Sequence, residues 1–198
     1  MPLPRKIAIG FRVHSGWAAM VAVAGSPSQP LILDRRRIEI AESSERGPVQ
    51  PYHMARDMGV ARGSVFLEQC REASKALATE SLQNAIKQVG GDRVRICGVL
   101  AGSGRLPPTL EATLASHAAI HTAEGEFFRE IVAHAGESCG LRVHRIKEKD
   151  LFGLAERRFD VPAANLQRVL DELGKMLGPP WQQDQKFAAL AAWLAASN

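Results

Sequence analysis

The stretch KIAIGFRVHSGWAAMVAVA, residues 6–24, decides the fold of this chain. Ile7, Ile9 and Phe11 alternate with other residues, which is the pattern of one face of a β-strand. After a short turn that contains glycine, residues 17–24 form a second apolar run. Because so short a turn can join only neighbouring antiparallel strands, we expect the chain to begin as a β-meander.

The elements predicted outward from this stretch are strands and then alternating helices and strands. A third strand carries Ile38 and Ile40 in alternation with charged residues, and later apolar residues follow a helical period that glycines end. A strand, a long helix and another strand form a right-handed crossover, so the last two strands should be parallel. The expected strands are 6–13, 17–24, 31–41, 93–100 and 141–146; the expected helices are 64–89, 107–139 and two that close the chain; residues 42–63 are expected to be a loop with a helical turn.

Length and composition fit one globular domain over residues 1–198. The chain is 45% apolar, well above the range of disordered proteins. Its three cysteines lie far apart, which argues against a disulfide framework or a compact cysteine zinc site and predicts buried thiols. Because the first twenty residues hold no long apolar segment, we expect no secretory signal, no membrane span and a cytoplasmic location.

The charge of the chain is weakly positive. The net charge of +4 is too small to indicate a nucleic-acid surface unless the basic residues cluster on one face. One cluster, residues 35–37, consists of three consecutive arginines. Side chains alternate in a strand, so these arginines cannot share a face, and a solvated edge strand protected by charge accounts for them.

The order of the predicted elements resembles the ribonuclease-H-like fold, nearest to its Holliday-junction resolvase branch. Three segments carry this resemblance: IAIGFRVHSGWA at the first strand and turn, AEGEFFREIVAHAGESCGLRVHRIKEKDL at residues 123–151, and DQKFAALAA at residues 184–192. The resemblance implies an α/β domain with a mixed five-stranded sheet, in which three antiparallel strands precede parallel strands and helices cover both faces.

The resemblance also implies a chemistry, which is hydrolysis of phosphodiesters by two metal ions. Carboxylates from the first strand, the end of the fourth strand and the last helix must converge on two divalent cations. In this sequence Arg12 occupies the first-strand position, residues 98–102 (GVLAG) contain no acid, and only Asp184 matches. A guanidinium repels a metal and supplies no ligand, so this departure from the pattern argues against nuclease activity.

Arg12 has two interpretations. It could bind an anion at the carboxyl edge of the sheet, where α/β domains usually place ligands. The interpretation that we favour is an ion pair with Asp184. The resemblance brings the first strand and the last helix together, and a half-buried arginine needs a carboxylate partner.

The run Gly102, Ser103, Gly104 and Arg105 follows a strand and precedes a helix. Glycines allow a close approach of the backbone, and amides at the start of a helix favour phosphate, which makes these residues candidates for ligand binding. No Gly-Lys-Ser/Thr follows, so the run is not a P-loop. A flexible turn is the favoured interpretation.

His117, His121 and Glu124 are spaced by four and three residues, so on a helix they share one face. Two imidazoles and a carboxylate could hold a metal ion there, and His53 could approach the same face. The competing interpretation is that these residues cap the helix or lie on its surface.

The sequence therefore leaves several functions open, and whether the chain is an enzyme is one of the open questions. The first hypothesis is a catalytically silent ribonuclease-H-like domain that binds a protein or a structured nucleic acid, with no cofactor indicated by the sequence. The alternative is a metal-dependent hydrolase with a relocated site, which would use Mg²⁺ or Mn²⁺. A nucleotide-binding domain of the actin and sugar-kinase group is disfavoured, because the phosphate loop of that group is absent at residues 10–16. The candidate residues of the relocated hydrolase site are His121, Glu124, Glu126 and Asp184.

Overall fold

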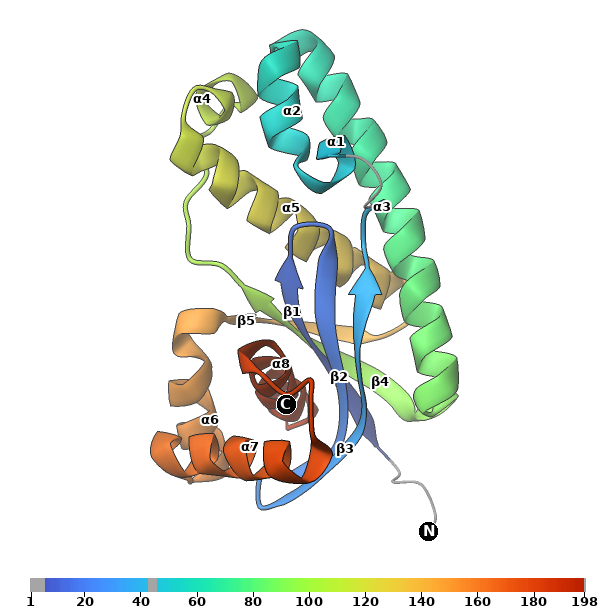
Figure 1. Ribbon diagram of the computed structural model, residues 1–198, viewed down its shortest axis with the longest axis vertical. Helices are drawn as coiled ribbons and strands as arrows, with labels where there is room; N and C mark the ends of the chain where they lie inside the picture. Colours follow the sequence, from blue (N-terminus) through green and yellow to red (C-terminus); the bar gives the residue numbers. More distant parts are fainter. Residues whose placement is uncertain (1–5, 43–45, 198) are drawn as a thin grey trace.

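The computed structural model describes residues 6–42 and 46–197, and it consists of a five-stranded sheet between two layers of helices (Figure 1). The order of the strands in the sheet is β3-β2-β1-β4-β5. β1, β2 and β3 are antiparallel neighbours, whereas β4 is parallel to β1 and β5 is parallel to β4. The strands are β1 (Ile7–His14), β2 (Trp17–Ser26), β3 (Gln29–Glu39), β4 (Val94–Ala101) and β5 (Arg142–Lys147).

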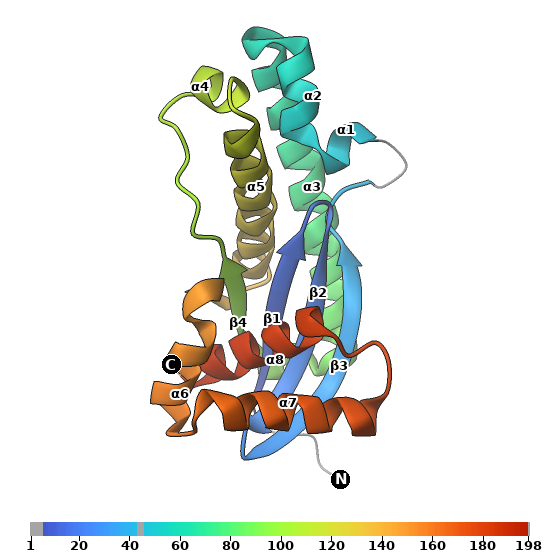
Figure 2. The ribbon, with the colours of Figure 1, turned by 60° about the vertical axis from the view of Figure 1, so that its left-hand side comes forward.

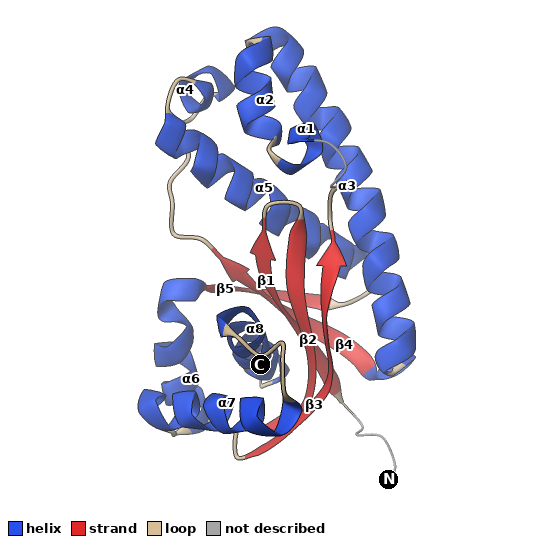
Figure 3. Cartoon of the chain, in the orientation of Figure 1, coloured by secondary structure: helices blue, strands red, loops and turns tan. Residues whose placement is uncertain are grey.

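The helices occupy the two faces and the upper end of the molecule (Figures 1 and 3). Two longer helices, α3 and α5, cover one face, and α6, α7 and α8 cover the other (Figure 2). The helices are α1 (Arg46–Val49), α2 (Pro51–Met58), α3 (Val60–Val89), α4 (Leu110–Leu114), α5 (His117–Ser138), α6 (Leu151–Phe159), α7 (Ala163–Leu177) and α8 (Gln183–Ala196), with short 3₁₀ helices η1 (Gly91–Arg93) and η2 (Glu148–Asp150).

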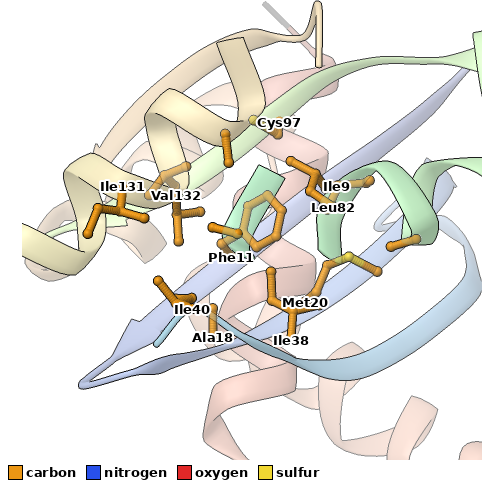
Figure 4. Packing of buried hydrophobic residues seen from close by; sticks show 14 of the residues in the cluster. Ile9, Phe11, Ala18, Met20, Ile38, Ile40, Leu82, Cys97, Ile131 and Val132 are labelled. Atoms are coloured by element: carbon orange, nitrogen blue, oxygen red, sulfur yellow. The ribbon is translucent and has the colours of Figure 1, made fainter. Parts of the chain in front are cut away.

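The predicted fold class is thus confirmed, and the expected strands lie within about two residues of the observed ones. The alternation in β1 explains the two cores. Ile7, Ile9 and Phe11 face α3 and α5, while Ala8 lies in the core beneath α8. Figure 4 shows Phe11 near the centre of the first core, on the side of Val132 of α5.

The prediction for residues 42–63 is wrong, because most of this segment is helical. Pro51 lies in the first turn of α2, where a backbone N–H has no partner within the helix, so a proline does not interrupt it. Gly59, with φ of +79°, lets the chain reverse from α2 into α3. Residues 43–45 fall outside the described residues.

A second helix was also missed. α6 follows β5 after the short helix η2 and is only nine residues long, too short for a clear helical period. Buried Leu151 and Ala155 hold it in place. The edge position predicted for the strand with three arginines is correct, since β3 ends the sheet.

Two smaller predictions can also be compared with the structure. Cys70 and Cys97 are buried and Cys139 is partly buried, and burial raises the pKa of Cys97 to about 12. None of the helices in the described part of the chain is long and apolar enough to cross a membrane.

Candidate functional site

The close approach of α8 to the sheet determines the geometry of the carboxyl edge. A Cβ atom on Gly10 of β1 would lie 1.8 Å from the carbonyl oxygen of Ala188, and one on Gly98 of β4 would lie 2.4 Å from that of Ala191. Only glycine allows a helix backbone to come so near to these strands. The N-terminal end of α8, with Asp184 in its first turn, is therefore held beside the end of β1.

Arg12 bridges two carboxylates at this edge. Its Nε and Nη2 donate hydrogen bonds to the two oxygens of Glu148, at 3.1 and 2.8 Å, and its Nη1 donates to Oδ1 of Asp184 at 2.5 Å. The guanidinium also lies over the ring of Phe187, 5.3 Å from its centroid. The contacts with Glu148 raise the pKa of Arg12 further, although partial burial opposes this. The predicted contact between Arg12 and Asp184 is confirmed.

Two members of this cluster were missed by the sequence reasoning. Nε2 of His14 lies 3.0 Å from Oδ1 of Asp184, and the His14 ring stacks on Trp17 with centroids 4.3 Å apart. Glu148 stands in η2, directly after β5, between Lys147 and Lys149. We call Arg12, His14, Glu148 and Asp184 the edge cluster.

The edge cluster does not fit a pair of magnesium ions. Both carboxylates are already bonded to one guanidinium, and their side chains are only 37% and 23% exposed. The end of β4 adds no acid. A hard divalent cation would need these same oxygens, so it would have to displace the Arg12 guanidinium from them and would then lie close to that positive group.

The loop that contains Gly102, Ser103, Gly104 and Arg105 lies along α5 rather than at the start of a helix. Cβ atoms on Gly102 and Gly104 would meet the Arg129 guanidinium at 2.9 Å and the Thr122 methyl group at 2.4 Å. Ser103 and Arg105 are exposed. The next helix, α4, begins eight residues after Gly102, has only five residues and is capped by the side chain of Thr109. These amides are thus not arranged around the beginning of a helix.

Three histidines meet between α2 and the beginning of α5, away from the edge cluster. Nε2 of His117 and Nε2 of His121, one turn apart on α5, are 3.0 Å from each other. The ring centroid of His53, from α2, lies 5.5 and 5.0 Å from those of His117 and His121. One nitrogen from each ring can be chosen so that all three lie within 4.8 Å of one another.

Glu124 lies behind the histidines. Its Oε1 is 2.9 Å from Nδ1 of His53 and accepts a hydrogen bond from the backbone N–H of the same residue at 3.3 Å. The side chain is 5% exposed, and Glu124 is the one buried charged residue in the described part of the chain. We call His53, His117, His121 and Glu124 the histidine cluster.

The residues of the relocated hydrolase site do not converge. His121 and Glu124 belong to the histidine cluster and Asp184 to the edge cluster, while Glu126 forms ion pairs with Arg145 at 3.5 Å and Arg129 at 3.7 Å. Among the described residues, His53, His117 and His121 are the one group of three or more potential metal ligands that lie close enough to share an ion.

Comparison with solved structures shows which fold this is. The chain superimposes on Thermus thermophilus RuvC with a TM-score of 0.55 and 10% identity, over 96% of this chain and 93% of RuvC. A second structure of T. thermophilus RuvC, in complex with a Holliday junction substrate, gives a TM-score of 0.54 and 10% identity over 97% of this chain and 93% of that one.

The fold is ribonuclease-H-like. The likeness to RuvC extends over almost the whole of both chains, including the helices at the two ends of the sheet. At the level of sequence, no protein-family model and no curated protein matches the chain.

Proposed function

We propose that this chain is a catalytically silent ribonuclease-H-like domain that binds structured nucleic acid. The observation that carries the proposal is the bridge formed by Arg12 between Glu148 and Asp184. The resemblance to the Holliday-junction resolvase branch implies that metal-binding carboxylates would lie at the carboxyl edge of the sheet. Here a positive side chain occupies the oxygens of the two acids that remain.

The surface around the edge cluster supports a polyanionic ligand. Lys147, at the end of β5, and Lys149, in η2, are exposed on either side of Glu148. Lys147 is the register partner of Ala101, the last residue of β4, and the loop that leaves this strand carries exposed Arg105. Several exposed cations therefore follow the ends of two adjacent strands, which is how a phosphate backbone is commonly bound.

The likeness to RuvC supports a branched or structured nucleic acid rather than a protein as the ligand. One of the two matching RuvC structures contains a Holliday junction substrate. A protein partner would use apolar surface, whereas the side chains that we invoke here are lysines and arginines.

A binding experiment tests the proposal. Labelled four-way-junction DNA, duplex DNA and single-stranded DNA are titrated with the protein at about 50 and 200 mM salt, conditions chosen because phosphate contacts weaken steeply across this range. We expect the junction to bind most tightly and affinity to fall at the higher salt. The Lys147→Ala/Lys149→Ala variant should bind all three more weakly and reduce the salt slope by about two, roughly one for each lysine that no longer pairs with a phosphate.

Lys87→Ala is the matched control, because Lys87 is an exposed lysine in the last turn of α3, on the other face of the sheet. It should bind like the wild type. Failure of the wild-type protein to bind any of the three DNAs would exclude DNA as the ligand and contradict the preference for a branched DNA.

A cleavage assay tests whether the domain lacks nuclease activity. With Mg²⁺ or Mn²⁺ the junction should remain intact. Cleavage that disappears in Asp184→Asn would contradict the proposal and would assign a catalytic role to the edge cluster, as the hydrolase alternative requires.

A further inference from the structure

The geometry points to a zinc-binding site formed by His53, His117 and His121, with one coordination position left open. This site is independent of the proposed function. It lies on α2 and the first turns of α5, at the end of the molecule away from α6, α7 and α8 (Figure 1).

The packing at this end fixes the three rings. A small apolar core of Ala55, Leu67, Leu114 and Ile120 joins α2, α3, α4 and α5. Ala55 lies two residues after His53, and Ile120 lies between His117 and His121 in the sequence; both are fully buried. The ligands therefore come from helices that are held together by their own core, rather than from loops.

The start of α5 is also fixed locally. The side chain of Ser116 accepts a hydrogen bond from the backbone N–H of Ala119, which caps the helix directly before His117. His117 and His121 are consequently one turn apart on a regular helix, with their Nε2 atoms 3.0 Å from each other.

The spacing of the nitrogens suits a tetrahedral ion. Zinc binds imidazole nitrogen at about 2.0–2.1 Å, so two ligands of one tetrahedron lie roughly 3.3 Å apart. The Nε2 atoms of His117 and His121 are 3.0 Å apart, and a nitrogen of His53 lies within 4.8 Å of both rings' ligand atoms. Small rotations of the rings would bring all three nitrogens to the separation of roughly 3.3 Å that a zinc ion requires. Imidazole ligands favour zinc and similar transition metals, whereas Mg²⁺ and Mn²⁺ prefer oxygen.

Glu124 acts as a positioning residue. When Nδ1 of His53 carries the ring hydrogen, it donates to Oε1 of Glu124, 2.9 Å away, and the lone pair of Nε2 is available for a metal. Carboxylates arranged in this way behind metal-binding histidines fix the tautomer and the ring orientation. The beginning of α5 carries a partial positive charge that opposes a cation, and the buried carboxylate supplies a compensating negative charge.

Three protein ligands leave a fourth position for water or another small ligand, as in catalytic rather than structural zinc sites. His117 and His121 are exposed, so this position is accessible from solvent.

Calorimetric titration of the full chain with Zn²⁺, after treatment with a chelator, tests the site. We expect one ion per chain with a dissociation constant in the micromolar range or below. His117→Ala and His121→Ala should each weaken binding by at least about 100-fold, and Glu124→Gln by about 10–100-fold.

His134→Ala is the matched control, since His134 is an exposed histidine on the same helix, away from the cluster. It should bind Zn²⁺ like the wild type. Circular dichroism checks that each variant is folded. Absence of saturable binding in the wild type, or equal affinity in folded His121→Ala, would overturn the proposal.

Substitution with Co²⁺ tests the open position. We expect the visible spectrum of a four-coordinate ion, which shifts when azide is added because azide replaces the bound water. A four-coordinate spectrum that azide leaves unchanged would indicate a fourth protein ligand and contradict the open position.

Discussion

The edge cluster and the histidine cluster each contain a carboxylate with basic partners, but they are opposite in design. In the edge cluster one guanidinium bonds two carboxylates and offsets one of their two negative charges. In the histidine cluster a single buried carboxylate orients one of three imidazoles, and two of the nitrogens face each other at 3.0 Å. The first arrangement is complete without a ligand, whereas the second gathers electron-pair donors that a metal could use.

The two clusters also depend on different parts of the packing. The edge cluster relies on α8 lying against β1 and β4, and the histidine cluster relies on the small core between α2, α3, α4 and α5. A ribonuclease-H-like sheet thus supports two sites that should be separable by mutation.

Gly10→Ala should have the largest effect on stability, and it should disrupt the edge cluster while it leaves the histidine cluster intact. The new Cβ atom would overlap the carbonyl oxygen of Ala188, so α8 must move away from β1. We expect a loss of at least about 3 kcal/mol in the free energy of unfolding, measured by urea denaturation, because the clash is between backbones and cannot be relieved by a side-chain rotation.

Gly153→Ala, in the helix α6, is the matched control. Its new Cβ atom makes only an ordinary contact, 3.5 Å from Nη1 of Arg157, so the variant should be more stable by about 0.5–1 kcal/mol. Zinc binding in any Gly10→Ala protein that remains folded should equal that of the wild type. If it were lost, the two clusters would not be separable.

Arg12→Ala should have the next largest effect. It leaves the half-buried carboxylates of Glu148 and Asp184 without their shared partner, and it removes the contact with Phe187. We expect a loss of about 1–3 kcal/mol in the free energy of unfolding, again measured by urea denaturation.

The control for Arg12→Ala is Lys175→Ala, which breaks the exposed ion pair with Glu172 on α7 and should have no measurable effect on unfolding. Arg12→Asp should not create magnesium binding, because β4 still ends without an acid. Equal stability of Arg12→Ala and the wild type would mean that the edge cluster is a solvated surface network.

The edge cluster could be predicted from the sequence only in part, and the reason lies in its elements. The pairing of Arg12 with Asp184 follows from the resemblance, which brings the first strand and the last helix together. Glu148 was missed because it stands among lysines in a 3₁₀ turn, where no periodic pattern indicates which side chain faces the sheet. His14 was missed because its role depends on the position of Asp184.

The histidine cluster was harder to predict. The spacing of His117, His121 and Glu124 showed a common helix face, and the sequence raised an approach of His53 to that face. It did not show how His53 would be held there, because the prolines and glycines of residues 42–63 concealed α2. Glu124 was considered as a direct ligand, whereas the structure places it behind His53. Convergence of residues far apart in the sequence depends on how helices pack, and a single sequence carries no direct signal for that.

Glu124→Gln should reduce stability by a smaller amount, about 1 kcal/mol, when no metal is present. The amide keeps the shape of the side chain and one hydrogen bond but loses the charge that attracts His53. Glu126→Gln, two residues further along α5 and partly exposed, is the control and should change unfolding by less than about 0.5 kcal/mol. Equal urea midpoints for both variants would argue that Glu124 does not fix His53.

Substitution of His144, in β5, should have the smallest effect on stability, and the effect should appear only in how stability depends on pH. It reports on β5 and not on the edge cluster. Its Nε2 is buried without a hydrogen-bond partner among the described residues, and burial, together with the charge of Arg142, lowers its pKa. Below about pH 6.5, His144 is therefore protonated in the unfolded chain while it is still neutral in the folded chain. The free energy of unfolding thus falls as the pH drops through this range. In His144→Gln the decrease in urea midpoint between about pH 7.5 and 5.5 should be smaller than in the wild type, whereas His134→Gln should retain the wild-type decrease. An identical pH dependence in His144→Gln would move the source of acid sensitivity away from β5.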